Sequence, residues 1–481
     1  MSQELNIVWL KRDLRTQDHD CLKAAENHNL EYMIIYIFEP SLIKHPDTSQ
    51  RHLQFIYHSI KDMNKELSKY NRSVTIFYEE ANIVFDYLRS CFKLSTVFSY
   101  KESGIQLTYD RDKIIGKFFK QYKVRWIEFN RHAIQRGKHC LVDWNNSYKN
   151  YLESSPIQNV FSNSNLVLEL PKFKLPNSFK KKISNYPKAF QKAGQSQAFK
   201  VLESFCESRY ESYMTHISKP YFAAQSCSRL SVYISWGNIT LRQIERVVRE
   251  KNLSNKFAKH AFLTRLRWNN HFIQKFEINC SYETEFLNTG FNKFSYENND
   301  DLLESFVNAK TGFPLIDACL RALKETGWIN FRMRAMLVSF VCHNLDQDFR
   351  RVVYFFANLF LDYEPGIHYP QFQMQAGTTG IHTIRMYNPI KQSIDNDKDG
   401  LFIKAYLPEI KDLPIHLIHE PYKIAPLEYS LFNIKLPSYY KNPIIDIQTS
   451  SRLAKQKLYA HKKSSLVKKD CLRINSLFNK A

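Results

Sequence analysis

The chain has 481 residues, and its 68 lysines and arginines outnumber its 47 aspartates and glutamates, which gives a net charge of +21. This length predicts two or three domains with sizeable cores. No charge-free apolar stretch is long enough to cross a membrane, which argues against an integral membrane protein. The excess of positive charge favours a polyanionic partner, and nucleic acid is the first hypothesis.

The sequence starts MSQELNIVWLKRDLR, where charges directly follow a short apolar run. This pattern is typical of neither a signal peptide nor a transit peptide, so we expect a cytoplasmic protein. Nine cysteines are scattered along the chain without a CxxC pair. That spacing predicts free, mostly buried thiols, with no metal site and no disulfide framework.

Short apolar runs rich in β-branched and aromatic residues are typical of buried parallel strands. They occur at 7–10, 32–38, 74–78, 97–100 and 124–129. Between them, segments such as 51–70 and 107–122 repeat apolar residues at three- and four-residue spacing, which indicates helices. This alternation predicts an α/β domain with a doubly wound parallel sheet over residues 1–131.

The composition changes after the predicted first domain. Proline, serine, asparagine and lysine are frequent in residues 132–200, which predicts a long inter-domain connector. From 201 to 481 a helical period prevails, so we expect an all-α second domain. The last 31 residues carry nine lysines and arginines against one acid. This basic end is either a solvated helix or loose tail, or a surface that contacts phosphates.

A charged turn, KRDLR, follows the first predicted strand at residues 11–15. It contains no glycine-rich dinucleotide fingerprint. On its residues alone we interpret it as a structural cluster of ion pairs, because charges at the end of a strand usually solvate that end.

Hydroxyl groups gather just before a predicted helix in SCSRLSVYISWGNITLRQI, residues 226–244. One interpretation is that Ser228 or Ser231 caps this helix. The other is that the free backbone amides of the turn bind phosphates, which the helix dipole favours. The residues alone leave both open.

These segments, together with TGFPLIDACLRALKETGWINFRMRAMLVSF at 311–340 and the loop at 360–393, resemble the photolyase/cryptochrome family. In that family a helical domain binds FAD, and an α/β domain holds an antenna pigment in many members. The usual FAD phosphate segment is Thr-Ser-x-Leu-Ser-x-Tyr-Leu, and here Cys227 replaces the threonine. The resemblance implies FAD contacts from Tyr213, Cys227, Ser228, Arg229, Leu230, Ser231, Trp328, Arg334, Asp362, Tyr363, Glu364 and His368.

The resemblance also implies roles around the flavin ring. Trp328 lines the cavity for flavin and substrate, on a predicted helix that carries Arg332 and Arg334 on nearly the same side. Arg334 pairs with Asp362 beside the ring, unless that pair is only a buried structural one. In the same loop, Glu364 takes the place of a second acid, and His368 takes the place of an asparagine that faces the reactive flavin nitrogen.

Lesion-binding residues follow from the resemblance with departures from the family pattern. Trp268 matches a tryptophan that stacks on the lesion, but Arg265 stands where dimer-splitting members have a glutamate. An arginine cannot accept the hydrogen bonds of thymine amides, although it can bind phosphate. Met374 replaces a second stacking aromatic residue. The implied catalytic residues are Trp268, Arg265, Trp328 and Met374, and the implied DNA contacts are Arg265, Trp268, Arg332 and Arg385.

The family's route for electrons to the flavin is altered as well. Phe349 and Phe372 stand at two positions of a relay that is usually built from tryptophans. Phenylalanine is far harder to oxidise than tryptophan. Any relay in this chain must therefore use tyrosines such as Tyr354, Tyr363 or Tyr369.

We therefore expect a deoxyribodipyrimidine photolyase, a monomeric repair enzyme in which excited, reduced FAD splits pyrimidine dimers in damaged DNA. A second, antenna chromophore stays unidentified, because Gln106 stands where folate-binding members have a glutamate. Asn330 and Phe331 replace the histidine pair of six-four photolyases, which argues against that sub-class. The alternative is a cryptochrome-like blue-light photoreceptor without repair activity, which the lost glutamate favours. A nucleic-acid-binding protein without a cofactor would leave the FAD segments unexplained.

Overall fold

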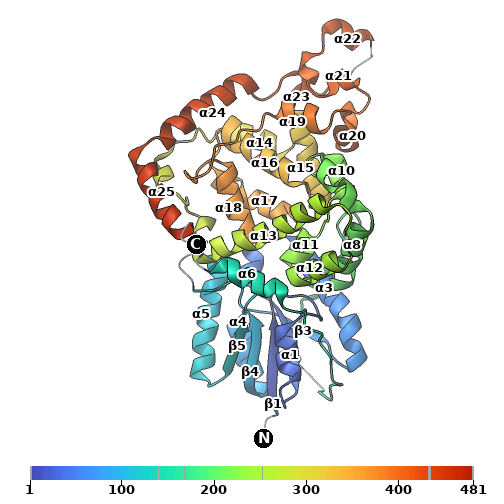
Figure 1. The fold of residues 1–481 in the computed structure, drawn as a ribbon, viewed down its shortest axis with the longest axis vertical. Coiled ribbons are helices and arrows are strands. Elements are labelled where there is room, and N and C mark those ends of the chain that lie inside the picture. The colour runs from blue at the N-terminus through green and yellow to red at the C-terminus, as the bar shows by residue number, and fades with distance from the viewer. Residues whose placement is uncertain are drawn as a thin grey trace.

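The protein has an α/β part at one end and a helical part at the other in the computed structural model (Figure 1). The structure describes residues 3–137, 141, 143–166, 170–251, 253–431 and 435–478. The predicted fold class, a parallel-sheet domain followed by a helical domain, is confirmed. Within the described ranges, no helix combines the length and the apolar character needed to span a membrane.

Five parallel strands form the sheet, in the order β3-β2-β1-β4-β5. The strands are β1 (Glu4–Leu10), β2 (Tyr32–Phe38), β3 (Val74–Tyr78), β4 (Lys93–Tyr100) and β5 (Arg125–Phe129). β1 is central, because Ile7 pairs with Met33 of β2 on one side and with Val97 of β4 on the other. The strand order reverses at β1, and in such sheets ligands commonly bind outside the carboxyl ends of the strands at this point.

Helices cover both faces of the sheet, because successive side chains of a strand point to opposite faces. These helices are α1 (Asp20–Glu26), α3 (Gln50–Leu67), α4 (Ala81–Cys91) and α5 (Gln106–Gln121). Val8 and Leu10 pack in a core with α1 and α3, whereas Ile7 and Trp9 pack in another with α4 and α5. The first of these cores continues into the helical domain, so the two domains share buried apolar surface.

The remaining helices belong to the α/β domain, to the connecting segment or to the helical domain. Up to residue 278 they are α2 (Pro40–Lys44), α6 (Trp144–Glu153), α7 (Asn177–Ser184), α8 (Gln195–Glu207), α9 (Tyr213–His216), α10 (Pro220–Ser226), α11 (Ser231–Ser235), α12 (Leu241–Glu250) and α13 (Lys256–Ile278). Beyond it they are α14 (Asp300–Val307), α15 (Pro314–Thr326), α16 (Phe331–Ser339), α17 (Val353–Leu359), α18 (Pro365–Gln375), α19 (Pro389–Asn396), α20 (Leu401–Tyr406), α21 (Ile415–Ile418), α22 (Pro426–Leu431), α23 (Ser438–Lys441), α24 (Ile447–Lys462) and α25 (Ser465–Phe478). The range predicted as a connector is thus partly helical, since it contains α6 and α7.

The basic end of the chain forms α24 and α25, drawn in red in Figure 1. Leu458, Val467 and Ile474 of these helices are buried against the rest of the helical domain. The apolar side of each helix is therefore fixed, and the basic residues lie on a folded surface rather than on a loose tail.

The charged turn and the residues after it bind the segment that joins α11 to α12. The Leu14 amide donates to the Trp236 carbonyl at 3.2 Å, and Asn238 Nδ2 donates to the Leu14 carbonyl at 2.7 Å. Asp18 pairs with Arg242 of α12 at 2.5 Å. Within the turn itself, Lys11 pairs with Asp112 at 3.1 Å and Asp13 with His19 at 2.8 Å, as the interpretation of a structural ion-pair cluster requires. The hydrogen bonds of Leu14 and the pair of Asp18 with Arg242 connect this region with the helical domain.

Gly237→Ala is expected to lower the thermal unfolding midpoint, because Gly237 has φ +71° and an added methyl group would lie 2.2 Å from the Arg12 carbonyl oxygen. A left-handed conformation costs a non-glycine residue roughly 1–2 kcal/mol, and the backbone overlap adds to this cost. Gly137→Ala is the matched control, since Gly137 has φ +80° and nothing lies within 4 Å of the added group. Equal losses of stability in the two variants would show that the contact with Arg12 is not tight.

Candidate functional site

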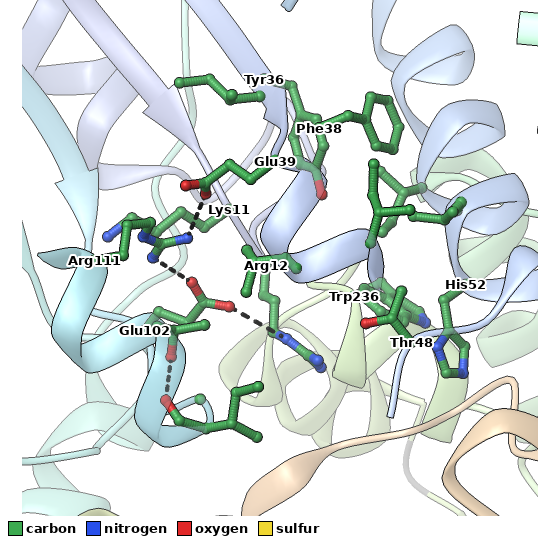
Figure 2. Close-up of a pocket in the computed structure, with 18 of the residues that line it drawn as sticks. Lys11, Arg12, Tyr36, Phe38, Glu39, Thr48, His52, Glu102, Arg111 and Trp236 are labelled. Atoms are coloured by element: carbon green, nitrogen blue, oxygen red, sulfur yellow. Dashed lines mark hydrogen bonds and ion pairs between the residues drawn. The ribbon is translucent and has the colours of Figure 1, made fainter. Parts of the chain in front are cut away.

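A small cavity lies at the carboxyl ends of β1 and β2, at the junction with the helical domain (Figure 2). Its volume is about 100 Å³. Arg111 bridges Glu39 at 2.9 Å and Glu102 at 2.8 Å, and Arg12 lies 3.5 Å from Glu102. Ligand pockets usually measure roughly 300–1,000 Å³, so an antenna pigment would fit here only if these ion-paired side chains moved.

Gln106, the position compared with a folate-binding glutamate, is not among the residues that line this cavity. Its Nε2 donates to Asp110 at 3.0 Å, and its Oε1 accepts from the Cys280 thiol at 3.3 Å. The side-chain amide is thus engaged with protein partners. The binding of a second chromophore therefore stays a prediction, and the Gln106 side chain is not free to bind one.

The turn before α11 has a left-handed residue, Arg229, at φ +57°. Leu230 is the N-cap of α11, which starts at Ser231, and no side chain makes a capping hydrogen bond there. The interpretation that Ser228 or Ser231 caps this helix is therefore wrong. The Ser231 hydroxyl is instead buried without a hydrogen-bond partner among the described residues, so it is left to bind another group.

Arg229 connects this turn with Trp328. Its guanidinium lies 3.9 Å from the centre of the Trp328 ring, and its Nε and Nη2 donate to Gln191 Oε1 at 3.2 and 3.0 Å. Burial lowers the pKa of Arg229 to about 10, against the opposing effect of the Asp362 carboxylate. The side chain therefore keeps its positive charge at neutral pH.

Trp328 is not on a helix. α15 ends before Gly327, which has φ +73° and forms the helix C-cap, and α16 begins only at Phe331. The prediction that one helix carries Trp328, Arg332 and Arg334 is therefore wrong. Only the two arginines lie on α16.

Arg334 and Asp362 form the pair that the resemblance implies. Arg334 Nη1 and Nη2 donate to the two carboxylate oxygens at 3.0 and 2.9 Å. Arg334 Nε donates to the Ile329 carbonyl at 2.8 Å, and the guanidinium lies 4.2 Å from the Phe360 ring centre. The guanidinium is held by these contacts in one orientation.

Two further predicted FAD contacts follow Asp362 in the chain. Glu364 Oε2 accepts from Arg131 of the first domain at 2.8 Å. His368 Nε2 lies 2.8 Å from the Val353 carbonyl, which can only accept, so this nitrogen carries the hydrogen. Burial lowers the pKa of His368 to about 4, and the neutral ring leaves Nδ1 as an acceptor.

Tyr363 directs its hydroxyl to the first domain. The hydroxyl lies 2.6 Å from Asp47 Oδ2, and the ring stacks on His52 with the ring centres 5.6 Å apart. Tyr363 is also among the residues that line the small cavity at the carboxyl ends of β1 and β2. The structure therefore groups this predicted FAD contact with first-domain residues.

Asp47 is in turn held by His45. His45 Nδ1 lies 2.7 Å from Asp47, and its Nε2 lies 3.3 Å from Glu283. Burial by itself lowers the pKa of His45, but hydrogen bonds to these two carboxylates outweigh it and raise the pKa from 6.5 to about 9. A raised pKa means that this contribution to stability is complete below pH 6.5 and is lost as the pH rises through about 9.

His45→Gln is therefore expected to flatten the fall in unfolding free energy between pH 6.5 and 9. Urea unfolding at the two pH values measures this difference. His416→Gln is the control, because the His416 side chain is 65% exposed. An unchanged slope in His45→Gln would show that the His45 ion pairs do not titrate in this window.

Two of the predicted lesion-binding residues, Arg265 and Trp268, lie on α13. Trp268 is 53% exposed, and the Arg265 guanidinium lies 5.9 Å from its ring centre. The same guanidinium lies 5.7 Å from the Tyr213 ring, and its Nη1 donates to the Ala261 carbonyl at 2.9 Å. Arg265 makes no ion pair within the described part of the chain. The structure thus brings Tyr213, Arg265 and Trp268 together.

The remaining predicted contacts are more dispersed. Arg332 Nη1 donates to Gln392 Oε1 at 3.4 Å. Met374 is half-buried on α18, and Arg385 is exposed in the segment between α18 and α19. The structure gives no contact that joins Met374 or Arg385 to Trp268 among the described residues.

Phe349 and Phe372, the two positions compared with relay tryptophans, are both buried. Three tyrosines form a connected group instead. The hydroxyls of Tyr363 and Tyr369 lie 3.2 Å apart, and the rings of Tyr354 and Tyr369 are 6.5 Å apart. An electron route through these tyrosines stays a prediction.

No sequence motif marks three residues that hold this site together. Gln191 holds Arg229, Asp47 holds Tyr363, and Arg131 holds Glu364. Arg131 and Glu364 are 233 residues apart in the chain, and Asp47 and Tyr363 are 316 apart. The acid Glu364 within the apolar stretch FLDYEPGIHY is the sequence feature that could have indicated a distant cationic partner.

Residues 6–151 match the family model of DNA photolyase, and residues 262–460 match that of the FAD binding domain of DNA photolyase. The chain belongs to the photolyase/cryptochrome family. The helical part of this photolyase/cryptochrome protein therefore contains an FAD-binding domain.

The residues present fit FAD. Buried side-chain atoms without a partner in the described structure include Ser231 Oγ, Asn330 Oδ1, Arg332 Nε and Glu364 Oε1. Each such atom costs about 1–3 kcal/mol if it stays unpaired. Hydroxyl and guanidinium donors together with carbonyl acceptors suit a cofactor that carries phosphates, hydroxyls and a polar ring.

Curated relatives of this photolyase/cryptochrome protein include both branches of the family. It is 28% identical to a deoxyribodipyrimidine photo-lyase of Buchnera aphidicola, covering 95% of this chain and 98% of that protein. It is 24% identical to cryptochrome DASH of Gloeobacter violaceus, covering 94% and 95%. A class III photolyase of Agrobacterium tumefaciens shares the fold, with a TM-score of 0.83 at 20% identity over 96% of this chain and 99% of that one.

Proposed function

We propose that this protein is a deoxyribodipyrimidine photolyase, an enzyme that uses light to split pyrimidine dimers in DNA. The observation that carries this proposal is the exposed Trp268 ring next to the Arg265 guanidinium, which makes no ion pair with any described residue. An exposed indole suits a base that has been flipped out of the duplex, and a guanidinium without a carboxylate partner suits the adjoining phosphate. The relative from Buchnera aphidicola, named a photolyase, supports this function.

Bound, reduced FAD supplies light-driven electron-transfer chemistry, and the protein supplies position and charge. Ser231 and Arg229 would hold the phosphates, because one offers an unpartnered hydroxyl and the other a buried cation. Arg334 and Asp362 would place a fixed charge pair beside the ring. Trp268 would stack on the lesion of damaged DNA, which the protein engages as a monomer.

A cryptochrome-like photoreceptor is the second candidate. The observation that favours it is Arg265, which cannot accept a hydrogen bond from a thymine amide as a carboxylate does. The relative from Gloeobacter violaceus, named cryptochrome DASH, is consistent with this alternative.

The deciding experiment measures the loss of cyclobutane dimers from irradiated oligothymidine. Purified, dithionite-reduced protein is incubated with the substrate under blue light and in darkness. Loss of dimers only in the light supports the photolyase and shows that Arg265 can replace the usual carboxylate. Unchanged dimers in the presence of bound, reduced FAD would refute repair of this lesion and favour the photoreceptor.

A further inference from the structure

A hollow on the surface of the helical domain is lined largely by lysines. The hollow, of about 390 Å³, lies where α24 meets α25 and the segment after α18. It is lined by Gly380, Tyr459, Lys462, Lys463, Lys468 and Cys471. Half of these lining residues are lysines, and none of the six carries a carboxylate. None of the residues predicted to bind FAD or the lesion lines this hollow.

The lysines of the hollow differ in what they contact. Lys462 Nζ donates to the His382 carbonyl at 2.7 Å, which fixes this ammonium at the wall. Lys463 and Lys468 are exposed, and neither makes an ion pair with a described residue. The nearby acid, Asp470, is already bound by Arg473 Nε at 2.6 Å and by the Thr289 amide at 2.8 Å. Two ammonium groups are therefore left to bind an external anion.

Backbone packing fixes the shape of the hollow. Gly380 has φ +73°, and an added methyl group would lie 2.8 Å from Cys471 Sγ and 2.4 Å from Asn288 Nδ2. The glycine thus lets α25 approach the segment that follows α18. Val467 of α25 is fully buried at the same place, so the lysines project from an ordered helix corner.

The positive charge of the hollow extends beyond its lining. Burial, and then the fields of Lys275, Lys462 and Arg385, lower the pKa of the neighbouring His382 to about 4. Arg385 is one of the predicted DNA contacts. Because Lys462 contacts the His382 carbonyl and Arg385 lies in the same segment, the hollow lies beside this predicted DNA contact.

We propose that this hollow binds the backbone of a DNA strand outside the lesion, with phosphates on Lys463 and Lys468. Ammonium groups bind phosphates without regard to sequence. The inference rests on the proposed DNA-repair function, and it adds a contact that helps to retain undamaged flanking DNA.

The test compares the double variant Lys463→Gln/Lys468→Gln with Lys181→Gln/Lys182→Gln, which removes two exposed lysines of α7. Binding of FAD-loaded full-length protein to undamaged duplex is measured by fluorescence anisotropy over a series of salt concentrations. We expect the slope of log affinity against log salt to fall by about 1.8 in the first variant, because each phosphate contact contributes about 0.9. Equal slopes in both variants would overturn the proposal.

The same variants separate this inference from the proposed function. The lysine variant should lose affinity equally for undamaged and dimer-containing DNA. If the proposed function is wrong, the unchanged protein has no preference for dimer-containing DNA, and this result does not depend on the lysines.

Protection of a cysteine from alkylation tests where DNA contacts the protein. Cys471 lines the hollow, and Cys91 of α4 is a half-buried reference far from it in the chain. Undamaged DNA should slow the alkylation of Cys471 relative to Cys91, as measured by mass spectrometry. If inorganic phosphate alone protects Cys471 and DNA adds nothing, the hollow is a small-anion site and the proposal is wrong.

Discussion

Asp362→Asn is expected to leave most of the purified protein without FAD and to lower the free energy of unfolding by about 3 kcal/mol. The Asp362 carboxylate accepts both Arg334 hydrogen bonds and is only 4% exposed. Asparagine keeps the shape but presents an NH₂ group to the guanidinium, so Arg334 loses its counter-charge. Removing one partner of a buried pair costs roughly 3–5 kcal/mol, and the 25% exposure of Arg334 places the effect at the lower end.

Two measurements on this variant separate a cofactor role from a structural one. The ratio of flavin to protein absorbance gives the FAD content, and urea unfolding gives the stability. Asp86→Asn is the control, because Asp86 pairs with Arg89 at 2.8 Å but is 56% exposed, and it should cost under about 1 kcal/mol. Lower stability with full FAD content would identify the pair as structural only, and no change in either would refute the predicted role.

Trp268→Ala is expected to weaken the binding of dimer-containing DNA by about tenfold or more without releasing FAD. Stacking of a base on an aromatic ring contributes about 1–3 kcal/mol, which corresponds to this loss. The Trp268 ring is 53% exposed, so its removal leaves the core intact. Anisotropy titrations with damaged and undamaged duplexes measure the effect as a change in preference.

Phe257→Ala and Trp268→Phe are the matched controls for this prediction. Phe257 lies on the same helix, α13, and is 68% exposed, so its removal tests whether any surface aromatic residue there matters. Trp268→Phe keeps a ring and should retain most of the preference. Release of FAD from Trp268→Ala would show that the assignment of this helix to the lesion side is misplaced.

The sheet could be predicted from the sequence because its strands are short apolar runs separated by amphipathic helices. Ile7 and Trp9 face α4 and α5, and such strands, buried on both faces, give an unbroken apolar pattern. The partly helical region at 132–200 could not be recognised, since its polar and proline-rich composition hides helices such as α6 and α7. The composition of a segment indicates how polar and how stiff the chain is. These helices are stabilised by packing on other elements, which composition does not reveal.

The site was predictable where the family resemblance assigns a role to both partners. Arg334 and Asp362 meet as the resemblance implies, 28 residues apart. The residues alone left the role of Ser231 open, because helix capping is a common use of a serine before a helix. Tyr363 could not be placed, since its partner Asp47 lies in the other domain, and nothing local to either residue indicates the contact.

Arg131 and Glu364 constrain the order in which this protein can accumulate mutations. Arg131 Nη1 donates to the Glu364 carboxylate, and its Nη2 donates to the carbonyls of Ile234 and Ser235. Within the intact fold, losing Arg131 first would leave the buried Glu364 carboxylate with only the more distant Arg12, whose Nη1 lies 3.9 Å away. Neutralising position 364 first costs less, because Arg131 keeps its carbonyl acceptors. A lineage can thus lose this pair more easily by changing Glu364 before Arg131.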